Sequence, residues 1–298
     1  MQKLLFYFTV VLIASCSVPK VMNESGRVTP KGHVTGGATY MGNFSGVGTS
    51  NITSVLVNSM KGYNNNGDSA YYSGLIKDVN KAMMAYSLDP LTVGSQFYLR
   101  VGIANRMELG YLRAKKTNMF QYNFQFLGFD KDQKLRDSKR WFGSAGIRYS
   151  WNKFTLPNYF SHVQQVLGYS YSRRDWLVPL TFSYSFGPEE CYGSVSFGAI
   201  YGHHHLSYSF VPNDLFNSNG LQVQGVSQTK NYSSFGFFCN LKAGYRFIYV
   251  IPSIAIFYQK YGTYLMLDQS QVGFSGWTLV PGISLQLNTV SMKKKKKS

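Results

Sequence analysis

Apolar and polar side chains alternate with a period of two along many segments of this chain. The clearest example lies between residues 118 and 128, where aromatic residues alternate with amides: Phe120, Tyr122, Phe124 and Phe126 against Gln121, Asn123 and Gln125. The same alternation recurs at 94–104, 175–186, 232–247 and 274–290. Neighbouring side chains on a strand point to opposite faces, so each segment has one apolar face. The pattern therefore predicts an all-β protein.

The second face of these segments distinguishes a soluble β-sandwich from a membrane barrel. A sandwich face in water is typically rich in Lys, Glu and Thr, whereas here Gly, Ser, Asn and Gln dominate and suit a crowded lumen. The segments are mostly about 10 to 16 residues long, while membrane strands need about 9–11 residues and globular strands average about 5–6. We therefore predict a transmembrane antiparallel up-and-down β-barrel.

Counting the patterned segments predicts about 12 strands, within a range of about 10 to 12. The segments lie near 33–46, 94–104, 107–116, 118–128, 141–151, 161–172, 175–186, 191–201, 204–211, 232–247, 249–264 and 274–290. With 12 strands, long connections such as 47–93 and 212–231 fall outside the cell, and so does the short connection Gly187–Glu190. Short turns, among them Asn105-Arg106, Arg173-Arg174 and Gly202-His203, fall in the periplasm, as in bacterial barrels.

The first long connection, 47–93, has helical spacing instead of alternation. Two faces recur at intervals of three and four residues: Ile52, Val55, Leu56, Ser59 and Met60, then Leu75, Val79, Ala82, Met83 and Tyr86. We predict two short helices in this first extracellular loop, which either enter the barrel mouth or pack on its rim. The barrel as a whole is predicted to occupy residues 33–290.

Composition agrees with a membrane barrel and limits the partners. The chain has 23 Tyr, 22 Phe and 29 Gly, and its 14% of charged residues is low for a soluble domain, which has about 25%. Beyond the first residues no stretch approaches about 18 apolar residues, which excludes a transmembrane helix. The net charge of +17 includes Lys293–Lys297 in a polylysine tail, 291–298. For an exported chain this charge favours anionic lipids or solutes over nucleic acid.

The amino terminus has the order of a secretion signal that ends in cysteine. Lys3 precedes an apolar run, Leu4–Ala14, which is followed by Ser15 and Cys16. This order resembles the lipobox of bacterial lipoproteins. The resemblance implies that residues 1–15 are removed, that Cys16 is acylated, and that residues 16–32 form a periplasmic tether to the barrel.

Lipobox, tether and alternating strands together resemble an outer-membrane β-barrel lipoprotein of Gram-negative bacteria. The resemblance implies an outer-membrane location, both lipid-anchored and integral, with outer-membrane lipids and the barrel assembly machinery as partners. The chain departs from the class at its last strand, which ends at Leu287-Asn288-Thr289-Val290 without a terminal aromatic residue. The class has no common active site, so only Cys16 is assigned a role by resemblance.

Five charged residues are predicted to face the lumen, because they occupy the polar positions of their strands: Arg100, Glu108, Arg148, Lys242 and Arg246. Charges in such a place need partners or water. One interpretation is a closed barrel held by a polar network. The other is a hydrated passage that favours small anionic solutes.

No catalytic, cofactor or metal site is predicted. His203-His204-His205 is the one cluster of histidines, but neighbours on a strand point apart, so only His203 and His205 share a face. The leading prediction is a non-enzymatic outer-membrane barrel, either structural or a passive small-solute pore. The alternatives are an outer-membrane lipid-modifying enzyme of the acyl hydrolase type and a soluble secreted β-sandwich that binds ligands.

Overall fold

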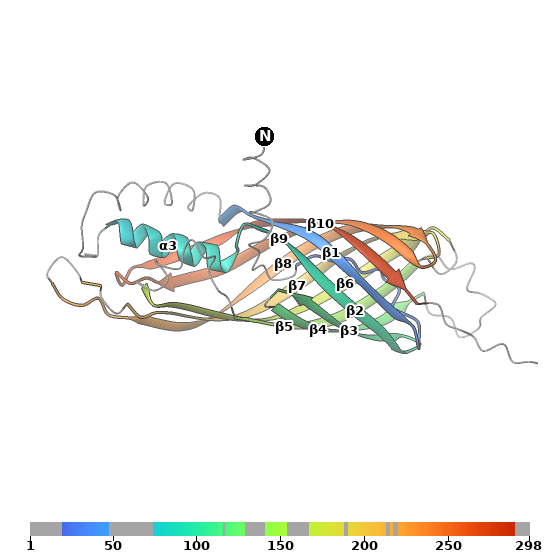
Figure 1. Ribbon diagram of the computed structural model, residues 1–298, viewed down its shortest axis with the longest axis horizontal. Helices are drawn as coiled ribbons and strands as arrows, with labels where there is room; N and C mark the ends of the chain where they lie inside the picture. The colour runs from blue at the N-terminus through green and yellow to red at the C-terminus, as the bar shows by residue number, and fades with distance from the viewer. Residues whose placement is uncertain are drawn as a thin grey trace, which may run out of the picture.

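Ten antiparallel strands close into a single barrel in the computed structural model (Figure 1). The structure describes residues 20–47, 74–115, 117–128, 141–153, 167–187, 190–212, 215–216 and 220–289. Strands that follow one another in sequence pair with one another, and β10 pairs with β1 to close the sheet. This is the predicted up-and-down barrel. The strands are β1 (Val34–Ser45), β2 (Thr92–Ala104), β3 (Met107–Ala114), β4 (Thr117–Leu127), β5 (Trp141–Lys153), β6 (Tyr169–Ser185), β7 (Gly193–Phe210), β8 (Val226–Tyr245), β9 (Ile248–Leu265) and β10 (Gln271–Asn288).

The leading count of 12 strands is wrong, and ten is the lower end of the predicted range. Two predicted turns lie inside strands: Arg173-Arg174 belongs to β6, and Gly202-His203 belongs to β7. As a result, the connection between β6 and β7, which was expected to be extracellular, lies at the same end as the start of β1 and the end of β10.

The misassigned turns lie where the outward side chains of β6 and β7 change from apolar to polar. On β6 the outward side chains are apolar from Trp176 onward, whereas Ser170, Ser172 and Arg174 before it are exposed and polar. On β7 the outward residues His203 and His205 are likewise exposed beyond Tyr201. The strands continue past the apolar zone, and the loss of apolar alternation resembles a turn in the sequence.

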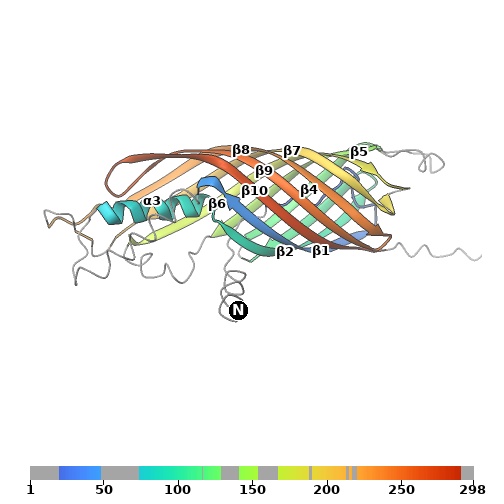
Figure 2. The ribbon, with the colours of Figure 1, turned by 90° about the horizontal axis from the view of Figure 1, so that it is seen from above.

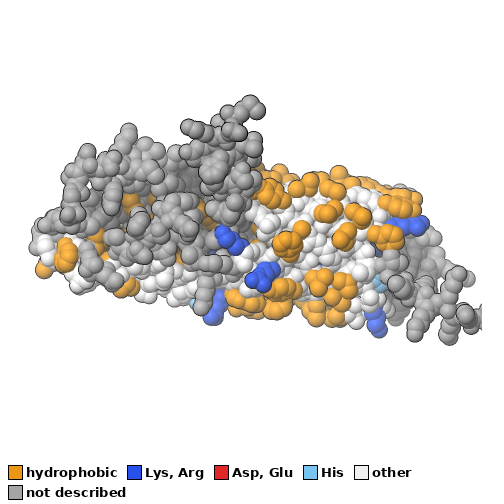
Figure 3. Space-filling view, in the orientation of Figure 1, with side chains coloured by type: hydrophobic (Ala, Val, Ile, Leu, Met, Phe, Trp, Pro, Cys, Tyr) orange, Lys and Arg blue, Asp and Glu red, His pale blue; other side chains and the backbone are white. Residues whose placement is uncertain are grey.

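The outer wall of the barrel carries the predicted apolar side chains. The exposed set includes Phe97, Leu99, Phe120, Phe126, Trp176, Phe235, Phe237, Trp277, Leu285 and Leu287. Figure 3 shows such side chains spread over one face of the barrel, with Lys and Arg near the two ends of this zone. Trp277 and Leu287 are ten positions apart on β10, about 34 Å along a strand and about 26 Å along the axis at a tilt of about 40°. That height matches the apolar band of membrane barrels, about 25 Å.

Aromatic contacts border this apolar band on both sides. Near one border Phe120 contacts Tyr111 and Trp151, with ring centroids 5.3 and 5.6 Å apart, and Tyr258 contacts Trp277 at 5.0 Å. Near the other border lie the pairs Phe126–Phe182, Trp141–Tyr184 and Tyr192–Tyr245. Two such girdles are typical of barrels that cross a membrane.

Helix α3 (Gly74–Leu88) confirms the second of the two predicted helices, while the first, 52–60, lies outside the described residues. Figures 1 and 2 show α3 at one end of the barrel, beside the parts of the long strands that continue past the band. We call this the helix end. We call the opposite end the turn end, where two residues join β2 to β3 and two join β8 to β9. Within the described part of the chain, no helix is long and apolar enough to cross a membrane.

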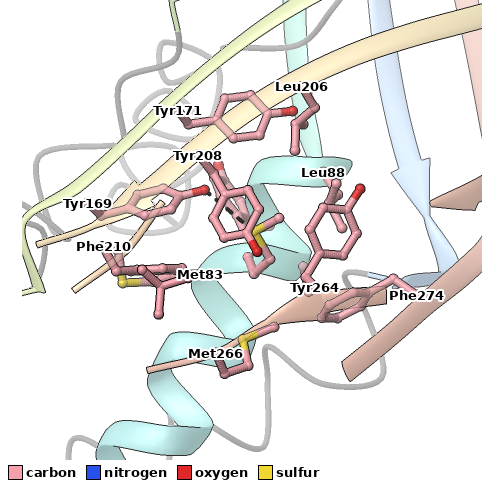
Figure 4. Close-up of a cluster of buried hydrophobic side chains, with 14 of the residues drawn as sticks. Met83, Leu88, Tyr169, Tyr171, Leu206, Tyr208, Phe210, Tyr264, Met266 and Phe274 are labelled. Atoms are coloured by element: carbon pink, nitrogen blue, oxygen red, sulfur yellow. Dashed lines mark hydrogen bonds between the residues drawn. The ribbon is translucent and has the colours of Figure 1, made fainter. Parts of the chain in front are cut away.

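The last turns of α3 are buried in an aromatic cluster at the helix end (Figure 4). The helix contributes Met83, Met84, Ala85, Tyr86 and Leu88. The strands and the connection between β9 and β10 contribute Tyr169, Tyr171, Leu206, Tyr208, Phe210, Tyr264, Met266 and Phe274. Because these contacts involve inward-facing residues of β6 and β7, the last turns of α3 lie in the mouth of the barrel and not on its outer rim.

Candidate functional site in the barrel lumen

Residues 20–33 run through the lumen of the barrel, and Lys31 and Gly32 are exposed where the segment leaves it. Along their length they are bonded in turn by Asn240 of β8, Ser183 of β6, Gln125 of β4 and Glu108 of β3. The last contact is a backbone hydrogen bond from Gly32 to Gly102 of β2, 2.8 Å long. These partners come from all around the barrel wall. The predicted periplasmic tether, 16–32, therefore lies inside the barrel from residue 20 onward.

The segment needs no regular sequence pattern, because side chains of the barrel wall bond its backbone groups. Its amides are bonded by side chains from the wall: Gly26 donates to Ser183 Oγ at 3.0 Å, Val28 to Gln125 Oε1 at 3.2 Å, and Thr29 to Glu108 Oε2 at 2.7 Å. Buried backbone groups need such partners. No helical or strand periodicity is required, so sequence patterns do not reveal the segment.

The segment reverses direction where it meets β1. Gly32 has a φ of 76°, a conformation that glycine adopts readily, and His33 N donates to Pro30 O at 3.0 Å. Gly102 allows the close approach, because a Cβ at that position would collide with the carbonyl oxygens of Thr29 and Pro30. The chain thus passes through the lumen once as residues 20–32 and returns as the first strand of the wall.

An ion pair joins the segment to the wall in the middle of the barrel. Glu24 Oε2 lies 2.7 Å from Arg148 Nη2, and both side chains are almost fully buried. Beside it, Arg100 Nη2 donates to Asn23 Oδ1 at 3.3 Å. Arg100 and Arg148 thus lie where the sequence places them, on the lumen side. Their acidic partner Glu24 was missed, because residues 16–32 were interpreted as a tether.

Glu108 and Lys242 also face the lumen, whereas Arg246 does not. Glu108 accepts hydrogen bonds from Thr29 N and Asn123 Nδ2, both at 2.7 Å. Lys242 Nζ lies 3.1 Å from Glu190 Oε2 near the turn end. Arg246 is exposed in the turn between β8 and β9 with a φ of 54°. The strand alternation ends at Tyr245, so extending it by one residue gave the wrong side for Arg246.

A second ion pair closes the lumen at the helix end. Lys20 Nζ lies 2.7 Å from Asp89 Oδ1, just after the last residue of α3. The carboxylate of Asp89 also accepts from Asn43 at 2.7 Å, from Gln259 at 3.0 Å and from Thr278. Burial alone raises the pKa of Asp89, but Lys20 and these donors outweigh it and hold the pKa below its ordinary value. One carboxylate thus joins the lumenal segment, the helix and the wall.

Near this pair, three side chains of β6, β7 and β8 form a chain of hydrogen bonds. Asp175 Oδ1 lies 2.5 Å from His204 Nδ1, and His204 Nε2 lies 2.7 Å from Ser234 Oγ. The order Asp–His–Ser is that of a catalytic triad. However, Ser234 is only 4% exposed and His204 2%, and the Tyr232 ring stacks on the imidazole at 4.5 Å.

Arg173 connects the Asp175–His204–Ser234 hydrogen bonds to helix α3 at the mouth of the barrel. Its guanidinium donates to Asp175 Oδ1 at 2.5 Å and to the Leu88 carbonyl of α3 at 3.2 Å, and lies 3.0 Å from His204 Nδ1. These residues were missed because Arg173 and His204 lie within or beside the segments interpreted as turns. Both are lumen-facing, and His203 and His205 point outward. Within the described ranges no group of His, Cys, Asp and Glu is placed to hold a metal ion.

Two predicted features lie outside the described residues. These are Cys16, the predicted acylation site, and 291–298, the polylysine tail. Both remain predictions.

No protein-family model matches this chain, and no curated protein matches it. Several solved barrels are similar. Ail, the attachment invasion locus protein of Yersinia pestis, is 10% identical with a TM-score of 0.32, over 86% of this chain and 99% of that chain. The outer membrane protein OprG from Pseudomonas aeruginosa is 8% identical with a TM-score of 0.33, over 89% and 99%. The N-terminal β-barrel domain of Pseudomonas aeruginosa OprF is 9% identical with a TM-score of 0.22, over 86% and 98%. Such low values say nothing of this chain's function, which we infer from its own residues.

Proposed function

We propose that this protein is a non-enzymatic β-barrel lipoprotein of a bacterial outer membrane, with a structural role and a lumen closed at rest by its own residues 20–33 and by α3. The membrane location is supported by the apolar band between two aromatic girdles on a closed sheet. A soluble β-sandwich does not account for that outer surface. The observation that carries the proposal is the buried Glu24–Arg148 pair in the middle of the lumen.

The buried ion pairs explain why the closed state is the resting one. Moving the segment out of the lumen separates Glu24 from Arg148 and Lys20 from Asp89, whose side chains are at most 6% exposed. Breaking a buried pair costs about 3–5 kcal/mol when one charge stays behind without its partner. An open passive pore is therefore unfavourable while residues 20–33 are in place.

A passage for small anionic solutes then forms only when residues 20–33 leave the lumen. Emptying the lumen exposes Arg100, Arg148 and Lys242 on the wall, against the acids Glu108 and Glu190. Basic side chains that line the middle of a passage favour anions there. The anion-favouring pore thus becomes a second, conditional state of the same barrel.

Planar-bilayer conductance of the purified protein tests this function. The full chain is compared with a variant that lacks residues 20–31, and folding of both is checked by heat-modifiable migration on a detergent gel. We expect no steady conductance from the full chain and an anion-favouring conductance from the deletion. Steady conductance of the full chain contradicts the closed barrel. Silence of a correctly folded deletion variant shows that α3 alone closes the lumen, which contradicts the role of the segment as the barrier.

A second candidate function, acyl hydrolysis, is favoured by the Asp175–His204–Ser234 contacts. In this alternative Ser234 is the nucleophile, His204 the base and Asp175 the group that orients it. We rank it second because Ser234 and His204 are buried and because the guanidinium of Arg173 contacts both Asp175 and His204. A fluorophosphonate probe distinguishes the two: labelling that disappears in Ser234→Ala supports the hydrolase, and an unlabelled wild-type protein supports the structural barrel.

A further inference from the structure

The lumenal segment has a direction, and that direction fixes the end of the barrel from which the preceding chain emerges. Residue 32 lies at the turn end, where Gly32 is bonded to Gly102 near the end of β2. Residue 20 lies at the helix end, where Lys20 is paired with Asp89 just after α3. The chain that precedes residue 20 therefore continues from the helix end, opposite to the end where β1 begins.

The depth of Lys20 can be compared with the outer surface through Asn43, which shares the carboxylate of Asp89 with it. The next residue on β1, Phe44, is exposed on the outer wall. Its partner on β10 is Leu279, two positions from the girdle residue Trp277. Lys20 thus lies inside the lumen at about the level of the aromatic girdle of the helix end.

Chain length then limits where Cys16 can be. Lys20 is four positions after Cys16, and a fully extended chain spans about 14 Å over four steps. Asn43 is two residues from the end of β1 at Ser45, about 7 Å of strand. It is nine residues from Val34 at the turn end, about 31 Å of strand and about 23 Å along the axis of a tilted barrel. Cys16 can reach the rim at the helix end and cannot reach the turn end.

We infer that the acylated amino terminus lies on the cell surface, with the acyl groups of Cys16 in the outer leaflet at the helix end. This inference rests on the proposed function, which supplies the acylated Cys16 and the outer membrane. The helix end carries the long first connection and strands that project past the apolar band, features of the extracellular side of bacterial barrels. At the turn end, two-residue turns join β2 to β3 and β8 to β9, as is typical of the periplasmic side.

This location reverses the one expected from the lipobox. An acyl chain added before the barrel forms belongs most simply to the periplasmic leaflet, and residues 16–32 would then hang below the barrel. The wall at the helix end is low where β1 ends at Ser45 and β2 begins at Thr92, while β6 to β10 project further. Lys20 lies at the level of the aromatic girdle on this low side of the wall. The acylated Cys16 therefore lies beside the lipid headgroups of the outer leaflet.

Epitope accessibility in intact cells tests the inference. An epitope is inserted between Ser17 and Val18 of the full chain. Two matched insertions serve as controls: one at Asp268, in the helix-end connection of β9 and β10, and one between Arg246 and Phe247, at the turn end. Each variant is first shown to migrate as a folded, heat-modifiable barrel. Antibody binding is then compared before and after the outer membrane is permeabilised.

We expect the epitopes at residues 17 and 268 to bind antibody on intact cells, and the epitope at 246 to bind only after permeabilisation. An epitope at residue 17 that stays hidden on intact cells, while the one at 268 is accessible, overturns the inference and leaves the outer-membrane barrel standing. Accessibility of the epitope at 246 alone also overturns it, because the barrel is then inverted. A protein without heat-modifiable migration refutes the proposed function itself.

Discussion

Glu24 and Arg148 meet in the centre of the barrel, 2.7 Å apart and 4% and 1% exposed. The acid comes from a segment without secondary structure, and the base comes from the middle of β5. A second pair, Lys20–Asp89, holds the same segment at the helix end. The barrel is therefore folded around part of its own chain, and that chain supplies bonding partners for the polar groups of the interior.

Glu24→Gln is expected to destabilise the barrel by about 3–5 kcal/mol, because Arg148 then remains buried without its counter-charge. The measurement is the midpoint of urea unfolding in detergent, followed by tryptophan fluorescence. Adding Arg148→Met in the same chain removes the unpaired charge and should restore most of the loss. Equal instability of the single and double variants would show that the pair does not hold the segment.

Gly202→Ala is expected to destabilise the folded barrel by about 1–3 kcal/mol through overpacking. A Cβ at this position would collide with Ser234 Oγ and approach His204 Nε2, so the hydrogen-bonded pair occupies the space that glycine leaves. Gly273→Ala is the control, since its Cβ meets only ordinary contacts, the nearest at 3.7 Å. We expect the unfolding midpoint of Gly202→Ala to fall below that of Gly273→Ala. A midpoint of Gly202→Ala equal to that of the wild-type protein would contradict this packing.

The lumenal charges should set the ion selectivity of the barrel that lacks residues 20–31. In that background Arg148→Gln is expected to move the chloride-to-potassium permeability ratio toward unity, because it removes a basic group from the passage. Arg246→Gln should leave the ratio unchanged, since Arg246 lies exposed in a turn. Reversal potentials in a salt gradient measure both. A change with Arg246 and none with Arg148 would contradict the assignment of the lumen.

Strand alternation predicted the barrel, and it failed where the environment of a strand changes along its length. Period-two patterns identified the outward side chains on β2, β4, β6, β8 and β10. The same rule split β6 at Arg173-Arg174 and β7 at Gly202-His203, because outward residues become polar once a strand leaves the apolar band. Outward polarity marks the end of the membrane zone and does not by itself mark the end of a strand.

The lumenal site was predictable only in part. Arg100, Glu108, Arg148 and Lys242 occupy inward positions of their strands, and strand alternation alone is enough to locate such residues. Their partners Glu24, Asn23 and Thr29 belong to a segment bonded by side chains of distant strands, and such contacts leave no local pattern in the sequence. One signal was present: four predicted lumenal bases faced a single predicted acid, and a closed barrel requires further acids from elsewhere in the chain.

The most direct test of the filled lumen is a disulfide cross-link formed in cells between Asn23→Cys and Ser284→Cys. The side chains of Asn23 and Ser284 are 3.5 Å apart, and the free thiols Cys191 and Cys239 are first replaced by serine. Asn23→Cys with Leu285→Cys is the control, because Leu285 faces outward from the next position of β10. We expect mild oxidation to give a faster-migrating looped chain on non-reducing gels for the 23–284 pair only. Absence of that product, or equal cross-linking of the 23–285 pair, would contradict a barrel closed by its own amino-terminal segment.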